Sequence, residues 1–154
     1  MIDTHSHIYL KDFDEDREEV YKRAVEAGIK TILMPAIDFG SLKQMDSLSF
    51  DGIEFHKMAG LHRCDVEELE DGFENRLLEL CSDDEIIGVG ETGLDYYWSK
   101  DHITEQKLSL HAHCRVAKKV NKPIILHNRE STDDLLHIIE QEQDGSLKGI
   151  WHCF

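Results

Sequence analysis

Short apolar runs alternate with longer amphipathic stretches along the whole chain. Runs rich in β-branched residues are typical of buried strands, and apolar residues recurring three and four positions apart are typical of helices. The clearest helical stretch is 66–81, where apolar residues recur at intervals of 3, 4, 4 and 3 positions from Val66 to Leu80. This spacing predicts a helix over these residues.

The alternation predicts an α/β protein. Because parallel strands need long crossover connections, which are usually helices, we expect a parallel sheet built from about six βα units. No repeat or Gly/Ser/Pro-rich linker interrupts the pattern, so residues 1–154 are predicted to form one domain. A helix is expected to begin near Ser131, where Ser131 and Asp134 resemble a capping box. The predicted strands cover 1–5, 30–36, 55–61, 85–90, 123–126 and 148–151, and the other predicted helices cover 14–27, 39–48 and 103–121.

Composition narrows the classes of partner. Lys and Arg number 17 and Asp and Glu 32, which gives a formal net charge of −15. An acidic surface repels phosphate backbones and anionic lipids, although bound divalent metals can invert the local field. No apolar run approaches the roughly 20 residues of a membrane span, and a strand at the second residue leaves no room for a signal peptide. The four cysteines form no CxxC pair, so we expect reduced thiols and a cytoplasmic protein without membrane contact.

Metal-competent residues follow the carboxyl ends of five of the predicted strands. In parallel α/β folds, ligands and catalytic groups gather at that end of the sheet. Alternate residues of an extended segment point the same way, so both histidines of the HxH pair can reach one ion. We assign no role to His56, His102, His111, His113 and His137, which lie inside predicted elements. The candidates are His5 and His7 after the first strand, His62 after the third, Glu91 and Asp95 after the fourth, His127 and Arg129 after the fifth, and His152 after the sixth.

This set of side chains favours hydrolysis by a metal-activated water. Imidazole and carboxylate ligands suit Zn, Mn, Fe or related ions, and a carboxylate such as Glu91 can bridge two of them. Each ion would lower the pKa of bound water and polarise the bond to be cleaved. Arg129 would offer a fixed fork to a phosphate or carboxylate oxygen, or else pair with a surface acid.

Four segments carry a family resemblance: IDTHSH at 2–7, VGETGLDYY at 89–97, the stretch from Gln106 through KPIILHNR at 122–129, and WHCF at 151–154. Through them the sequence resembles the TatD family of metal-dependent deoxyribonucleases, within the amidohydrolase-like barrels. The resemblance implies a (β/α)8 barrel, a DNA or nucleotide phosphodiester substrate, and two divalent ions (Mg, Mn or Zn). It implies metal ligands at His5, His7, Glu91, His127 and His152, catalytic roles for Glu91, Asp95 and Arg129, and a substrate site lined by His62, Asp95 and Arg129.

The sequence departs from the family in two places. Arg63 follows His62 where the family usually has proline. Barrels of this type need about 250 residues, so we expect an incomplete TIM-barrel-like domain that lacks the last two βα units. The family's final ligand, an aspartate after the eighth strand, would then be missing. Exposed barrel edges would favour self-association.

Two alternatives to a TatD-type nuclease stay open. One is a catalytically weak or inactive remnant that binds only metal or a partner. The other is a different hydrolase on the same barrel, such as an amidohydrolase or another phosphoesterase. The GETGLDYY segment at 90–97 speaks against this second alternative.

Overall fold

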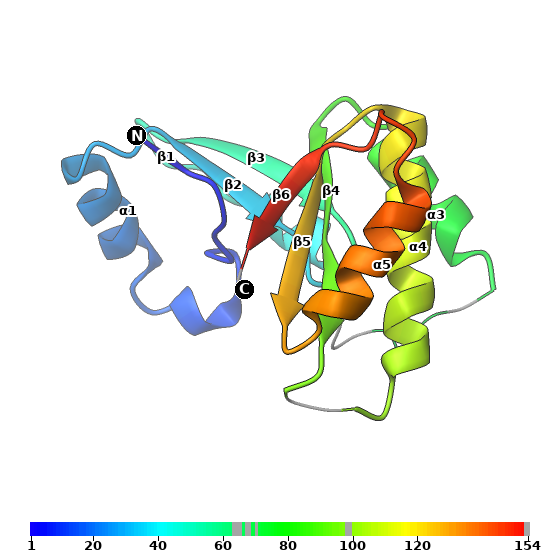
Figure 1. The fold of residues 1–154 in the computed structure, drawn as a ribbon. Coiled ribbons are helices and arrows are strands. Elements are labelled where there is room, and N and C mark those ends of the chain that lie inside the picture. The colour runs from blue at the N-terminus through cyan, green and yellow to red at the C-terminus, as the bar shows by residue number, and fades with distance from the viewer. Residues whose placement is uncertain (63–65, 67–68, 70, 98–99, 153–154) are drawn as a thin grey trace.

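The structure, a computed structural model, describes residues 1–62, 66, 69, 71–97 and 100–152. Its strands form one six-stranded sheet in the order β1-β2-β3-β4-β5-β6, and every neighbouring pair is parallel. The sheet curls into a half-barrel with helices between the strands (Figure 1), which confirms the predicted fold class. Arg63, Cys64 and Cys153 lie outside the described residues.

The described elements follow the predicted alternation along the chain. The strands are β1 (Ile2–Asp3), β2 (Thr31–Pro35), β3 (Glu54–Ala59), β4 (Ile86–Asp95), β5 (Ile124–Arg129) and β6 (Gly149–His152). The helices are the 3-10 helix η1 (Lys11–Phe13), α1 (Arg17–Glu26), α2 (Ser41–Met45), α3 (Phe73–Cys81), α4 (Ile103–Val120) and α5 (Thr132–Glu142). None of these helices combines the length and the apolar character that a membrane crossing requires.

The helices form two groups on the outer side of the sheet. Helices α3, α4 and α5 lie together beside β4 and β5, whereas α1 lies apart, beside β1 and β2 (Figure 1). Leu77, Leu110 and Leu135, one from each helix of the larger group, are fully buried in a single apolar cluster. A second cluster joins Tyr21 of α1 to Ile32 and Met34 of β2. These two clusters hold the sheet in its curved shape.

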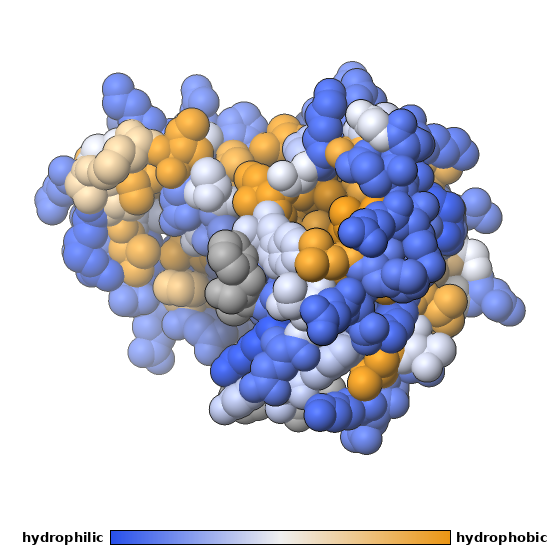
Figure 2. Space-filling model, viewed as in Figure 1, coloured by the Kyte–Doolittle hydropathy of each residue, from blue (hydrophilic) through white to orange (hydrophobic). Residues whose placement is uncertain are grey.

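The edges of the sheet are open in the described part of the chain. Strands β1 and β6 each pair with one neighbour. Ile2 of β1 is 62% exposed and Ile150 of β6 is 50% exposed. Figure 2 shows hydrophobic residues in the middle of the face that carries β6 and again at the end that carries α1, with hydrophilic residues over the helices on the other side.

Strand β4 is longer than the sequence pattern predicts. The apolar run ends at Gly90, but the strand continues to Asp95, so Glu91 lies inside the strand and not after it. The same holds for β5, which was expected to end before His127 and continues to Arg129. Pairing of β4 with β5 explains both differences, because the register from Thr92↔Leu126 to Asp95↔Arg129 extends through the polar residues.

Two local predictions are wrong. Helix α3 begins at Phe73, because Gly72 has a φ of 92° and a residue in the left-handed region interrupts a helix. Ser131 does not cap α5 with its side chain. Its hydroxyl lies 2.8 Å from both the Leu94 carbonyl oxygen and Asn128 Oδ1, so a tertiary contact replaces the expected capping box.

Gly93 is the glycine on which the β4–β5 contact depends most clearly. Its φ is 143°, and a Cβ there would lie 2.0 Å from the carbonyl oxygen of His127. We expect Gly93→Ala to lower the free energy of unfolding by several kcal/mol, since backbone strain alone costs about 1–3 kcal/mol and the overlap adds to it. Gly145→Ala is the matched control, because Gly145 has a φ of 96° but open space around it. Urea unfolding of both variants tests this, and equal losses of stability would contradict it.

Candidate metal centre

Glu91 lies at the centre of the candidate site. Its side chain is 2% exposed, and each carboxylate oxygen faces two imidazoles. Oε2 lies 3.0 Å from His5 Nε2 and 3.2 Å from His7 Nε2. Oε1 lies 3.1 Å from His127 Nδ1 and 3.0 Å from His152 Nε2. The structure thus brings together the five side chains predicted as metal ligands, which come from the segment after β1 and from β4, β5 and β6.

The main chain fixes where Glu91 stands. Its N–H donates to the carbonyl of Ala36, and the Ala36 N–H donates to the carbonyl of Gly90, at 3.0 and 3.2 Å. Strand β4 therefore bonds directly to the end of β2 beyond the point where β3 stops. This closes the curl of the sheet at its carboxyl end, so His5 and His7 after β1 can reach a carboxylate on β4.

The spacing of these groups suits ions between them. Two ligand atoms about 2.1 Å from a tetrahedral ion lie roughly 3.4 Å apart, close to the nitrogen–oxygen distances around Glu91. Two triads have ligand atoms within 4.8 Å of one another: His5, Glu91 and His152, and His62, Glu91 and His127. His62, expected at the substrate site, lies with its Nε2 3.8 Å from Glu91 Oε1. That these groups bind metal stays a prediction.

The surroundings of Glu91 favour the ionised form of its carboxyl group. Burial alone would raise the pKa of this carboxyl, but hydrogen bonds from His127, His152, His5 and His7 lower it more, and its pKa lies well below the usual range. A buried carboxylate is stable only with compensating positive charge or hydrogen-bond donors around it. The site therefore favours cations.

Tyr9 orients the ring of one predicted ligand. Its hydroxyl donates to the Pro35 carbonyl at 2.8 Å and lies 3.0 Å from His7 Nδ1. Since the hydroxyl proton is used on Pro35, the oxygen accepts from Nδ1–H, which holds the ring with its Nε2 facing Glu91. An imidazole whose other nitrogen is held in this way is typical of a metal ligand. The sequence pattern does not indicate a role for Tyr9, for which only its place two residues after His7 could have been a signal.

Asp95 lies behind His127, on the side away from Glu91. Its Oδ2 is 3.1 Å from His127 Nε2, and its Oδ1 accepts the backbone N–H of Tyr97 at 2.9 Å. His127 is thus held between two carboxylates, with Nδ1 toward Glu91. The geometry gives Asp95 a way to orient a predicted ligand.

Arg129 lies beside the same segment. Its guanidinium carbon is 3.7 Å from the centre of the Tyr97 ring, a cation–π arrangement. Register pairing places Arg129 opposite Asp95. The stacking fixes the fork of the guanidinium near the β4–β5 end of the cluster.

Comparison with known proteins assigns the family. A family model described as "TatD related DNase" matches residues 2–154. The chain belongs to the TatD-related DNase family. The resemblance found in the sequence is confirmed.

Relatives and solved structures agree with this family. The chain is 30% identical over 154 residues to "Uncharacterized metal-dependent hydrolase YabD" of Bacillus subtilis, covering 100% of this chain and 60% of that protein. It is 26% identical to "3'-5' ssDNA/RNA exonuclease TatD" of Shigella flexneri, covering 100% of this chain and 59% of the relative. The crystal structure of YJJV, a TatD homologue from Escherichia coli, matches with a TM-score of 0.81 and 27% identity over 92% of this chain and 56% of that one. This TatD-family chain therefore spans about 60% of the length of its relatives.

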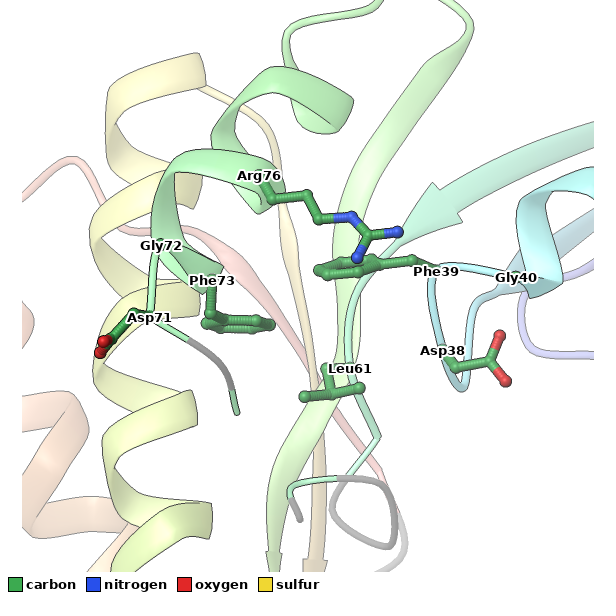
Figure 3. Close-up of a pocket in the computed structure, with 8 residues that line it drawn as sticks. All are labelled: Asp38, Phe39, Gly40, Leu61, Asp71, Gly72, Phe73 and Arg76. Carbon is green, nitrogen blue, oxygen red and sulfur yellow. The ribbon is translucent and has the colours of Figure 1, made fainter. Parts of the chain in front are cut away.

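A cavity of about 380 Å³ borders the exit of β3 in this TatD-family chain, on the side of α3 (Figure 3). Phe39 stacks on Phe73 at 5.6 Å between ring centres, and the guanidinium of Arg76 lies 4.6 Å from the Phe39 ring. Asp38, Gly40, Leu61, Asp71 and Gly72 complete its lining. None of the predicted ligands lines this cavity, so it is separate from the Glu91 cluster.

His113 of α4, to which the sequence analysis assigned no role, supports the segment that carries His62. It is fully buried. Its Nδ1 donates to the Ser109 carbonyl at 2.7 Å, and its Nε2 accepts the N–H of Leu61 at 3.0 Å. This bond requires a neutral imidazole, and burial lowers the pKa of His113 to about 4.

We expect this histidine to destabilise the fold in mild acid. Because the unfolded pKa is about 6.5 and the folded pKa is about 4, the unfolded chain binds the extra proton between these pH values. The free energy of unfolding should therefore fall as pH drops from 6.5 to 4, by up to about 3 kcal/mol. His113→Gln keeps an acceptor for Leu61 N–H without titrating, so its free energy of unfolding should fall less over this range. Denaturant unfolding at several pH values measures the difference. His137→Gln, at an exposed histidine of α5, is the control, and an unchanged slope in His113→Gln would contradict the assignment.

Proposed function

We propose that this chain carries the metal centre of a TatD-type nuclease, which hydrolyses phosphodiester bonds of single-stranded DNA with a metal-activated water. The observation that carries the proposal is the buried Glu91 carboxylate, which has two imidazoles on each oxygen. A bridging carboxylate between two sets of nitrogen ligands is suited to a two-ion hydrolytic centre.

The residues present fit such a centre. His5 and His7 would hold one divalent ion with Glu91 Oε2, and His127 and His152 would hold a second with Oε1. The imidazole-rich set suits Zn or Mn better than Mg. When bound, these ions would lower the pKa of water and polarise the phosphodiester.

The chain's own side chains would orient the substrate around this centre. Arg129, fixed over Tyr97, offers a planar fork for a phosphate oxygen. Asp95 holds His127 in one orientation, and His62 lies beside Glu91 Oε1, where it could contact either an ion or the substrate. With a net charge of −15, binding of an oligonucleotide depends on positive charge at the site itself.

The choice of single-stranded DNA rests on the relatives. The Shigella flexneri protein named as a 3'-5' ssDNA/RNA exonuclease shares 26% identity with the chain. Single strands also reach a recessed centre more easily than a duplex does. Single-stranded RNA is the comparison substrate.

A second candidate is a chain that binds metal or a partner with little hydrolysis. It is favoured by His152, which lies on the edge strand β6 and is 29% exposed, so a predicted ligand has support on one side only in the described sheet. A ligand held about 1 Å loosely can cost roughly 10²-fold in rate.

Metal binding is the first expected outcome. We expect the purified chain to bind Zn²⁺ or Mn²⁺ in a calorimetric titration, and Glu91→Gln to weaken both positions, because the amide is neutral and offers one ligand oxygen in place of two. His137→Ala, on the exposed face of α5, should bind like the wild type. Absence of binding by the wild type, or wild-type binding by Glu91→Gln, would contradict the proposed centre.

Hydrolysis is the second expected outcome. We expect the chain to cleave labelled single-stranded DNA when Mg²⁺, Mn²⁺ or Zn²⁺ is present, to lose activity in EDTA, and to lose at least about 10²-fold in rate on Glu91→Gln. Arg129→Lys should raise KM more than it lowers kcat, since lysine lacks the fork. His137→Ala again serves as the control.

The outcomes separate the two candidates. Metal binding without turnover supports the second candidate. Turnover that survives both EDTA and Glu91→Gln would place the active site elsewhere.

A further inference from the structure

Gln106, in the first turn of α4, forms hydrogen bonds with the main chain at the end of β4. Its Oε1 accepts the N–H of Asp95 at 2.9 Å, and its Nε2 donates to the Asp95 carbonyl at 3.4 Å. Gln106 is 4% exposed and Asp95 2%. A side-chain amide therefore binds both polar groups of one buried residue.

The pairing of β4 in the sheet explains why these two hydrogen bonds are needed. Strand β3 pairs with β4 only as far as Ala59↔Val89, while β4 continues to Asp95. The N–H of Tyr96 donates to the Arg129 carbonyl on β5, and successive residues of a strand direct their main-chain groups to opposite sides. The N–H and C=O of Asp95 therefore face the side that β3 no longer covers. Since buried main-chain groups need partners, Gln106 takes the place of the missing strand.

The hydrogen bonds from Gln106 to the Asp95 main chain also affect the candidate metal centre, through the contact of Asp95 with His127. Asp95 Oδ2 lies 3.1 Å from His127 Nε2, and the opposite nitrogen of that ring lies 3.1 Å from Glu91 Oε1. A shift of the Asp95 main chain would move its carboxylate, and with it the ring of His127.

We propose that Gln106 is a positioning residue, which acts through Asp95 to orient the imidazole of His127. The inference deepens the proposed function and rests on it only for the final step, from the orientation of His127 to metal affinity. The two bonds to Asp95 need a side chain with both a donor and an acceptor. Glutamine is an uncharged side chain that has both groups and is long enough to reach the Asp95 main chain.

The test is a double-mutant cycle with two readouts. The variants are Gln106→Met, Asp95→Ala and the double substitution; Gln141→Met, at an exposed glutamine of α5, is the matched control. The first readout is the ring NMR signal of His127 in the metal-free protein. We expect Gln106→Met and Asp95→Ala each to shift it, and the double variant to shift it no further than Asp95→Ala. Gln141→Met should leave it in place.

The second readout is the affinity for Zn²⁺. Loss of an outer hydrogen-bond partner of a ligand typically costs 10–100-fold in metal affinity. We expect about 10-fold for Gln106→Met, and no further loss when it is added to Asp95→Ala. A merely structural role would give additive effects, because it would not pass through Asp95.

The NMR readout tests the inference about Gln106, and zinc binding by the wild type tests the proposed function. An unchanged His127 signal in Gln106→Met, or additive shifts in the double variant, would overturn the inference whatever the metal result. If the wild type binds no Zn²⁺ while the NMR cycle shows coupling, the proposed function is wrong and the orientation of His127 by Gln106 stands.

Discussion

A single buried carboxylate, Glu91, sets the constraint that the rest of the site satisfies. An ionised carboxylate in a protein interior is costly unless positive charge or donors surround it. Imidazoles from β5, β6 and the segment after β1 meet this demand at 3.0 to 3.2 Å. Those elements lie far apart in the sequence, so the demand can be met only if the sheet curls until its first and last strands approach one another.

Helix α4 supports the site indirectly. Its side chains bind main-chain groups next to the candidate ligands and do not themselves contact Glu91. Beyond Val89, β3 no longer pairs with β4, and two buried polar side chains of α4 bind the main-chain groups on that side. Gln106 binds the end of β4 at Asp95, and His113 binds the exit of β3 at Leu61. The candidate site is therefore supported by one long helix as well as by the sheet, which links the packing of α4 to the geometry of His62 and His127.

Much of the fold was predictable from local pattern, and so were the side chains that converge on Glu91. Strands and helices show their own periodicity, and ligand-type residues stood near the carboxyl ends of strands. Sequence pattern failed where long-range bonding decides the outcome. The polar continuation of β4 becomes a strand because β5 pairs with it, and the Ser131 hydroxyl bonds to Leu94 and Asn128. The bonds that Tyr9, Gln106 and His113 make could not be predicted, since their partners are main-chain groups or side chains that only the folded sheet brings near.

The most direct test of the proposed metal centre is the position of bound ions in crystals of the chain soaked in zinc, located by anomalous scattering. Ions are expected on both sides of the Glu91 carboxylate, about 2.0–2.2 Å from its oxygens and from the facing imidazole nitrogens. Crystals in which zinc occupies only other positions, with the Glu91 cluster left without an ion at saturating zinc, would contradict it.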